Sequence, residues 1–209
     1  MKVLIVDDHA VVREGLKQIL ADDPEIGTVG EAGDARQMKD NIRNEKWDVV
    51  VLDITLPGQS GLEALKDLKQ AHPELPVLVL SMHPENQFAV RVLKAGADGY
   101  INKETAPKEL LAAVKKVFGG GKYVSPRMAE NLIGEVQGNV ATVPHQKLSD
   151  REYEVLRLIA SGKKPGEIAA DLSLSVKTVS TYRERILQKM GLKTNAELTR
   201  YALENHLIE

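Results

Sequence analysis

Residues 49–53 read Val-Val-Val-Leu-Asp, four consecutive apolar residues that end in an aspartate. A short continuous apolar run is typical of a strand that is buried on both faces of a parallel sheet. Similar runs lie before and after it, at Val3–Val6, Ile26–Val29, Val77–Leu80 and, more weakly, Gly99–Ile101. The first 120 residues therefore contain five predicted strands.

Amphipathic stretches of helical length separate these runs. Their apolar positions at helical spacing include Val12, Leu16, Ile19 and Leu20, then Leu62, Leu65 and Leu68, then Phe88, Val92 and Leu93, and then Leu110, Leu111, Val114 and Val117. Capping-box spacing marks two helix starts, Asp34 with Gln37 and Ser60 with Glu63. Five strands alternating with five helices predict a flavodoxin-like α/β domain with a doubly wound, five-stranded parallel sheet.

Polar residues stand where four of the predicted strands end: Asp7-Asp8, Asp53, Ser81 and Lys103. In such a sheet, ligands bind outside the carboxyl ends of the strands. Crowded carboxylates raise one another's pKa, and a divalent cation relieves the repulsion. A site made of oxygen ligands favours Mg²⁺, and the lysine and the serine hydroxyl could hold an anion beside the metal.

These residues, with Leu56-Pro57-Gly58, Gly61 and the run from Gly96 to Lys103, resemble the receiver domain of bacterial two-component response regulators. The resemblance covers residues 1–120. It implies that Asp53 accepts a phosphoryl group from a sensor histidine kinase. It also implies that the domain catalyses only its own phosphorylation and dephosphorylation, and that the protein is otherwise not an enzyme.

The same resemblance implies the roles of the remaining site residues. Asp8, Asp53 and the backbone carbonyl of Thr55 would bind Mg²⁺, or another divalent cation such as Mn²⁺, and Asp7 would act largely through water. Lys103 would pair with the phosphoryl oxygens. Ser81 would move to hydrogen-bond the phosphoryl group, and Tyr100 would change rotamer in response.

Other interpretations of the acidic residues exist. A phosphohydrolase of the haloacid-dehalogenase type also uses an aspartyl nucleophile, but its pattern needs a second aspartate two residues later, where Thr55 stands. A phosphorylation-regulated adaptor that binds protein instead of DNA is a second alternative. The third is a DNA-binding protein that is independent of phosphorylation.

Composition sets broader limits. The formal net charge is −2, and there is no cysteine, which excludes disulfides, thiol nucleophiles and zinc sites built on sulfur. No apolar run is long enough for a membrane span and no signal-peptide pattern is present, so we expect a cytoplasmic protein that does not bind membranes. The charge is uneven, at −4 for residues 1–120 and +4 for residues 176–193.

Residues 121–147 are predicted to be a linker between two domains. Gly119-Gly120-Gly121 is expected to stop a helix, and Ser125-Pro126 to start a short one that carries Met128, Leu132, Ile133 and Val136. The remainder of the linker is short of residues that form a core.

Residues 148–209 read as a small all-α domain of four helices. Ser149 with Glu152, and Thr194 with Glu197, have capping-box spacing, and the last helix is expected to run through Leu207. A helix that starts at Pro165 and a long helix from Val176 to Met190 are separated by a tight turn, which is typical of a helix-turn-helix.

On the long helix we expect one buried and one exposed face. The positions assigned to the buried face are Val176, Val179, Ile186, Leu187 and Met190, and those opposite are Lys177, Ser180, Thr181 and Glu184, flanked by Arg183 and Arg185. Small polar residues bordered by cations suit a helix that enters the major groove of DNA.

The run Leu148-Ser149-x-Arg151-Glu152, the segment Glu167-Ile168-Ala169 and the run Ser175-x-Lys177-Thr178-Val179 resemble the LuxR-type output domain. With the receiver, this is similar to the NarL/FixJ response regulators, which bind double-stranded DNA as homodimers through the third helix. RNA polymerase is a further implied partner. The DNA-binding candidates are Lys177, Thr178, Ser180, Thr181, Tyr182, Arg183, Glu184, Arg185 and Lys189. Many members carry lysine and histidine where Ser180 and Tyr182 stand, so the operator preference cannot be copied from a relative.

Overall fold

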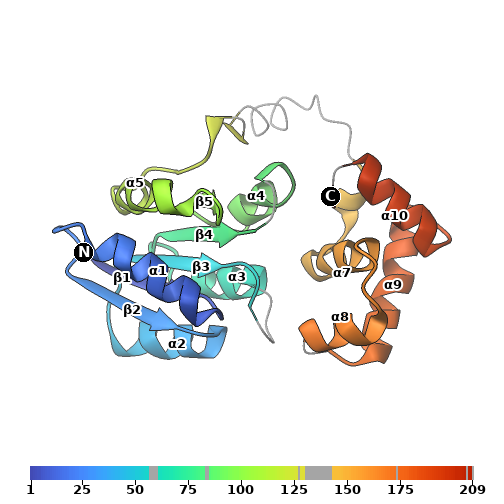
Figure 1. The fold of residues 1–209 in the computed structure, drawn as a ribbon, viewed down its shortest axis with the longest axis horizontal. Helices are drawn as coiled ribbons and strands as arrows, with labels where there is room; N and C mark the ends of the chain where they lie inside the picture. Colours follow the sequence, from blue (N-terminus) through green and yellow to red (C-terminus); the bar gives the residue numbers. More distant parts are fainter. Residues whose placement is uncertain are drawn as a thin grey trace. The chain divides into compact units, whose positions relative to one another are not determined.

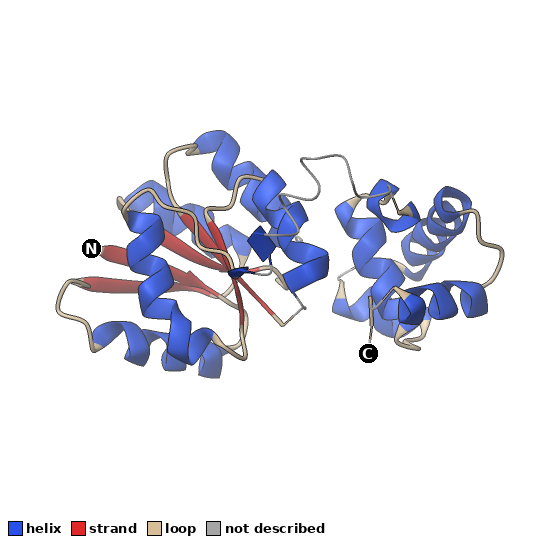
Figure 2. Cartoon of the chain, turned by 90° about the horizontal axis from the view of Figure 1, so that it is seen from above, coloured by secondary structure: helices blue, strands red, loops and turns tan. Residues whose placement is uncertain are grey.

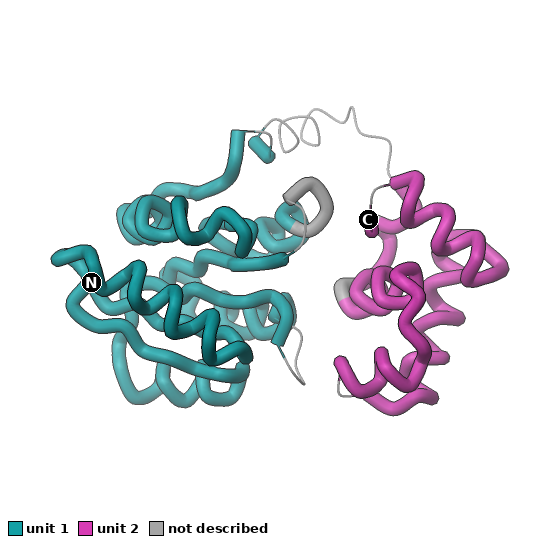
Figure 3. Tube along the Cα trace, in the orientation of Figure 1, with its two compact units in different colours: residues 1–137 teal, residues 138–209 magenta. Residues whose placement is uncertain are grey.

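The computed structural model describes residues 1–56, 61–82, 85–126, 128–129, 143–172, 174–205 and 207–208 (Figure 1). The chain divides into two compact units, Met1–Gln137 and Gly138–Glu209 (Figure 3). Within the described residues, none of the helices combines the length and the apolar character needed to cross a membrane.

The first unit contains a five-stranded parallel sheet with the strand order β2-β1-β3-β4-β5. Its strands are β1 Lys2–Val6, β2 Thr28–Ala32, β3 Val49–Asp53, β4 Val77–Ser81 and β5 Gly99–Asn102. The order reverses between β1 and β3, which are hydrogen-bonded neighbours with Val6 opposite Leu52. Loops at such a reversal diverge and leave a crevice at the carboxyl ends of the strands.

Helices flank both faces of this sheet (Figure 2). They are α1 Ala10–Ala21, α2 Ala35–Asn44, α3 Gly61–Ala71, α4 Glu85–Lys94 and α5 Ala106–Phe118. Leu20 of α1 and Val114 of α5 are buried in one cluster with Val3, Val51 and other strand residues that alternate along the sheet. Since successive strand residues point to opposite faces, the remaining strand residues face the other helices. The predicted doubly wound α/β fold is confirmed.

The second strand starts later than the sequence suggested. Ile26 is buried, but it belongs to a turn in which its backbone N–H donates to Asp23 O at 3.0 Å. Pairing with β1 starts only at Thr28, opposite Lys2. An apolar side chain can reach the core from a turn. The apolar character of Ile26 therefore did not show that it belongs to the strand.

The chain returns along the outer edge of β5 after α5. The backbone N–H of Tyr100 donates to Tyr123 O at 2.9 Å, and that of Tyr123 donates to Asp98 O at 2.9 Å. A Cβ at Gly99 would lie 2.8 Å from Tyr123 O, so this close approach needs a glycine. The first residues of the predicted linker are therefore hydrogen-bonded to the sheet.

The second unit is all-α, as predicted. It contains the 3₁₀ turn η1 Pro144–Lys147 and the helices α7 Asp150–Ala160, α8 Pro165–Asp171, α9 Val176–Met190 and α10 Asn195–Glu204. Ser149 and Thr194 cap α7 and α10 as their spacing indicated, and Gly191 ends α9 with a φ of 67°. The prediction that α10 runs through Leu207 was wrong: it ends at Glu204, and Leu207 is buried beyond it.

Some predictions lie outside the described residues. They are the cap at Ser60 and the linker positions Leu132, Ile133 and Val136. The start of that linker helix is described, because Ser125 O accepts a hydrogen bond from the backbone N–H of Ala129 at 3.0 Å.

Replacing Gly61 with alanine should destabilise the first unit. The new Cβ would lie 2.5 Å from Ile54 Cα and 2.6 Å from Asp53 O, both backbone atoms. Overpacking of this kind costs roughly 1–3 kcal/mol. The test is urea unfolding followed by fluorescence of Trp47, the single tryptophan in the sequence.

Gly15→Ala is the matched control, since nothing lies within 4 Å of its Cβ position in α1. Alanine in a helix interior should raise stability by about 0.5–1 kcal/mol. Equal unfolding midpoints for Gly61→Ala and wild type would contradict the close packing of Gly61 on β3.

Candidate functional site

The carboxyl ends of β1 and β3 bring acidic side chains together. Asp7 and Asp53 are buried, at 0% and 1% exposure, and the Asp8 side chain is 33% exposed. One ligand atom from each of Asp7, Asp8, His9 and Asp53 lies within 4.8 Å of the others. The predicted gathering of the three carboxylates at this edge is therefore observed.

Lys103 reaches this cluster from the end of β5. Its Nζ donates to Asp7 Oδ2 at 2.6 Å and to Asp53 Oδ2 at 2.7 Å. The lysine side chain is only 11% exposed, and the two buried carboxylates compensate its charge. Ser81 ends β4, the strand between β3 and β5, and is fully buried, and its carbonyl accepts from the Lys103 backbone N–H at 2.8 Å.

Burial shifts the ionisation of this group of side chains. Burial raises the pKa of Asp53 to about 6, although Lys103 and a hydrogen bond from the Thr55 backbone N–H act against the rise. Burial alone would lower the pKa of Lys103, but the carboxylates of Asp53 and Asp7 outweigh it and raise that pKa. At neutral pH, above this pKa, the Asp53 carboxylate is mostly ionised and lies beside the charged Lys103.

The oxygen-rich cluster fits a hard divalent cation. Carboxylate and carbonyl oxygens are the ligands that Mg²⁺ prefers. Asp8 and Asp53 can supply carboxylate oxygens, and Thr55 can supply its backbone carbonyl oxygen. Two buried carboxylates beside a partly exposed one also give the negative charge that such an ion needs.

His9 belongs to this site, although it was not among the residues expected from the sequence. Its Nδ1 lies 2.8 Å from Asp8 Oδ1 and 3.3 Å from Asp7 Oδ1, and its backbone N–H donates to Asp7 Oδ1 at 2.8 Å. Arg13 was also missed, and its Nη1 donates to the Asp7 carbonyl at 2.6 Å. The signal for His9 was its position directly after the aspartate pair.

Tyr100, the predicted switch residue, is fully buried on β5. Its backbone N–H is bonded to Tyr123, so the residue links the interior of the sheet to the segment that follows α5.

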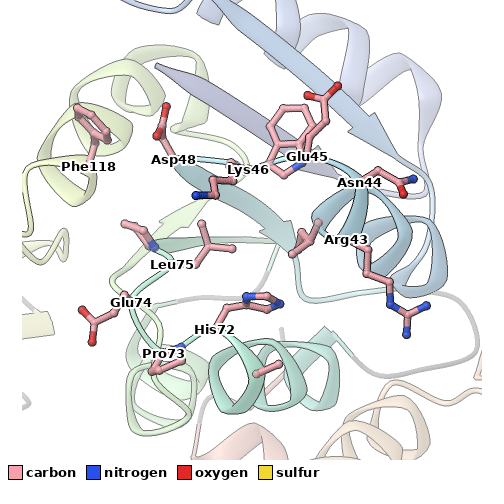
Figure 4. A pocket seen from close by; sticks show the side chains of 14 residues that line it. Arg43, Asn44, Glu45, Lys46, Asp48, His72, Pro73, Glu74, Leu75 and Phe118 are labelled. Atoms are coloured by element: carbon pink, nitrogen blue, oxygen red, sulfur yellow. The ribbon is translucent and has the colours of Figure 1, made fainter.

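A separate cavity of about 880 Å³ lies at the other end of the sheet (Figure 4). It is lined by residues that precede β3 and β4, including Asp48 and Leu75, and by Phe118 at the end of α5. The acidic cluster lies at the carboxyl ends of the strands, so this cavity is not part of it.

In the second unit, α9 presents the exposed face that the sequence predicted. Lys177, Ser180, Thr181, Glu184 and Arg185 are exposed, whereas Thr178, Tyr182 and Arg183 are half-buried. The buried positions are Val179, Ile186, Leu187 and Met190. The assignment of Val176 to that face was wrong: it is 51% exposed.

Two of the candidate DNA-binding cations have partners inside the second unit. Lys189 Nζ donates to Glu152 Oε2 at 2.6 Å, and Arg183 Nε donates to Asn195 Oδ1 at 2.6 Å. These two side chains are therefore bonded within the domain, and Lys177, Arg185 and Lys189 are all exposed.

Each of the two units contains a match to a known family. Residues 3–115 match the response regulator receiver domain, and residues 146–202 match the luxR family of bacterial regulatory proteins. The chain is a two-component response regulator of the NarL/FixJ type. As such it has a receiver domain around the acidic cluster and a LuxR-type domain around α9.

Relatives of this response regulator match it along nearly its whole length. It is 35% identical to the response regulator UvrY of Escherichia coli (strain K12), over 99% of this chain and 95% of that protein. It is 37% identical to the oxygen regulatory protein NreC of Staphylococcus carnosus (strain TM300), over 100% of both. A structure of Salmonella typhimurium RcsB is 28% identical with a TM-score of 0.71, and one of an RcsB–DNA complex is 29% identical with a TM-score of 0.60; each covers 96% of both chains.

Glu152→Gln should destabilise the LuxR-type domain in a pH-dependent way. Burial would raise the pKa of Glu152, but hydrogen bonds from Lys189 and Ser149 hold it below the ordinary value of 4.5. Its stabilising effect is therefore present above pH 4.5 and is lost as the pH falls through the lower folded value. At pH 7 the loss should be about 1–3 kcal/mol.

The measurement is the urea midpoint for unfolding of the LuxR-type domain at several pH values. Trp47 lies in the receiver domain, so this transition is detected by circular dichroism and not by Trp47 fluorescence. The difference between wild type and Glu152→Gln should shrink below pH 4.5. Glu204→Gln is the control, because Glu204 is 62% exposed in a surface pair with Arg200. A difference that is independent of pH would contradict the ion pair.

Proposed function

We propose that this response regulator controls transcription through Mg²⁺-dependent phosphoryl transfer from a sensor histidine kinase to Asp53. The observation that carries the proposal is the buried Asp53 carboxylate, hydrogen-bonded to Lys103 in a cluster of carboxylates suited to a divalent cation. Asp8, Asp53 and the Thr55 carbonyl would hold the ion, with Asp7 acting through water. When bound, Mg²⁺ or Mn²⁺ neutralises charge on the transferring phosphoryl group.

In the proposed reaction, a carboxylate oxygen of Asp53 attacks the phosphorus of a phosphohistidine. The new P–O bond forms as the P–N bond breaks, and the imidazole of the kinase leaves. Lys103 then pairs with the phosphoryl oxygens, and Ser81 donates its hydroxyl to one of them. In this proposal the protein catalyses only its own phosphorylation and dephosphorylation and is not otherwise an enzyme.

The added negative charge draws Lys103 and Ser81 inward, and Tyr100 changes rotamer. This shifts the population toward a state that binds double-stranded DNA as a homodimer in the cytoplasm. RNA polymerase is the further proposed partner. The exposed polar face of α9, with Lys177 and Arg185, supports its entry into the major groove.

Asp53→Asn should abolish labelling by radioactive acetyl phosphate in the presence of Mg²⁺, because the amide cannot accept the phosphoryl group. Asp40→Asn, whose side chain is 56% exposed, should label like wild type. Labelling of Asp53→Asn at the wild-type level would overturn the assignment.

Lys177→Ala and Arg185→Ala should each weaken duplex binding and reduce the slope of log affinity against log salt by about 1, because each removes one phosphate contact. The measurement is fluorescence anisotropy of a labelled duplex at several salt concentrations. Lys46→Ala, which removes an exposed charge from the receiver, is the control. An unchanged slope in both α9 variants would contradict this interface.

A further inference from the structure

Two hydroxyl groups on the exposed face of α9 already use their protons within the helix. Ser180 Oγ donates to Val176 O at 3.1 Å, and Thr181 Oγ1 donates to Lys177 O at 3.1 Å. Both bonds run from a residue to the carbonyl four positions before it, a common arrangement for serine and threonine within helices.

As long as the two hydroxyls keep these bonds, the bonds limit which hydrogen bonds the two residues make with a ligand. A hydroxyl has one proton and two lone pairs, and a carbonyl can only accept, so the proton must point to the carbonyl. Toward the outside, Ser180 and Thr181 therefore present acceptors. Glu184, one turn further on and also exposed, is an acceptor when ionised.

The same end of the helix also presents methyl groups. Val176 is 51% exposed and lies one turn from Ser180. Thr181 adds the methyl group of its own side chain. The amino-terminal half of α9 thus combines acceptors and methyl groups beside Lys177, the exposed cation proposed above to contact a phosphate.

Base pairs differ in what they offer to such a surface. In the major groove adenine presents an N6 amino donor, and thymine presents a C5 methyl group. Guanine presents only acceptors there, which would face the acceptors of the helix, and cytosine has an amino donor but no methyl group. Only an A·T pair offers both a donor and a methyl group.

We propose that the amino-terminal half of α9 selects A·T base pairs. Ser180 and Thr181 accept hydrogen bonds from adenine amino groups, and the methyl groups of Thr181 and Val176 contact thymine methyl groups. The proposal rests on the proposed DNA binding and adds the class of base pair that is read.

The first experiment selects sites from a random pool of duplexes with the full-length protein after treatment with acetyl phosphate and Mg²⁺. The selected half-sites should have A·T pairs at the positions that α9 contacts. The base substitutions described next identify those positions. In a selected duplex, single thymines are then replaced with uracil, and single adenines with purine, which lacks the amino group. At contacted positions we expect affinity losses of about fourfold for the methyl group and about fivefold for the amino group.

Two variants of Thr181 separate its two proposed contacts. Thr181→Ser keeps the hydroxyl and removes the methyl group, so one thymine should become insensitive to uracil while the purine effect stays. Thr181→Val keeps a methyl group and removes the hydroxyl, so one adenine should become insensitive to purine while the uracil effect stays. Thr28→Ser, on an exposed position of β2, should change neither response.

Ser180→Ala removes the other hydroxyl acceptor and so provides a second test of the amino contact. Alanine also has a higher helix propensity than serine. Guanine at the contacted positions would overturn the proposal, as would uracil and purine effects that persist equally in every variant. In those cases salt-dependent DNA binding remains and the proposed function stands. Absence of binding to any duplex would overturn the proposed function together with this inference.

Discussion

The charged contact of Lys103 with Asp7 and Asp53 is the constraint on which the receiver domain depends. Two carboxylates buried at neighbouring strand ends are unfavourable unless a cation neutralises them. Lys103 supplies that charge from β5, on the far side of β4, so one side chain ties three strand ends together. A phosphoryl group on Asp53 would add negative charge at this point and compete for the same ammonium group.

The contacts of β5 extend from this cluster to the segment after α5. Lys103 follows β5 directly, and the backbone of Tyr100 in that strand is bonded to Tyr123. The Tyr123 hydroxyl donates to Glu109 Oε2 in α5 at 3.3 Å, and Lys116 Nζ lies 5.7 Å from the centre of its ring. Contiguous contacts along β5 thus join Lys103 to the start of the connecting segment.

Some cations of α9 bond to neighbouring elements of the LuxR-type domain, and others lie on its exposed face. Residues 176–193 have a net charge of +4. Lys189 is bonded to Glu152, which also caps α7, and Arg183 is bonded to Asn195 at the start of α10. These bonds hold α9 against its neighbours, and Lys177 and Arg185 remain exposed. The helix can thus be fixed in the domain and still present cations to a polyanion.

The sequence by itself determined the fold of both domains and the members of the acidic cluster. Continuous apolar runs and capping residues are local signals, and the strand ends of a parallel sheet share one edge, so Asp7, Asp53 and Lys103 could be brought together without coordinates. Only the tertiary structure decided the contacts of His9, the exposure of Val176 and the partner of Lys189. Those depend on which neighbouring element covers each side chain, and periodicity along one helix does not contain that information.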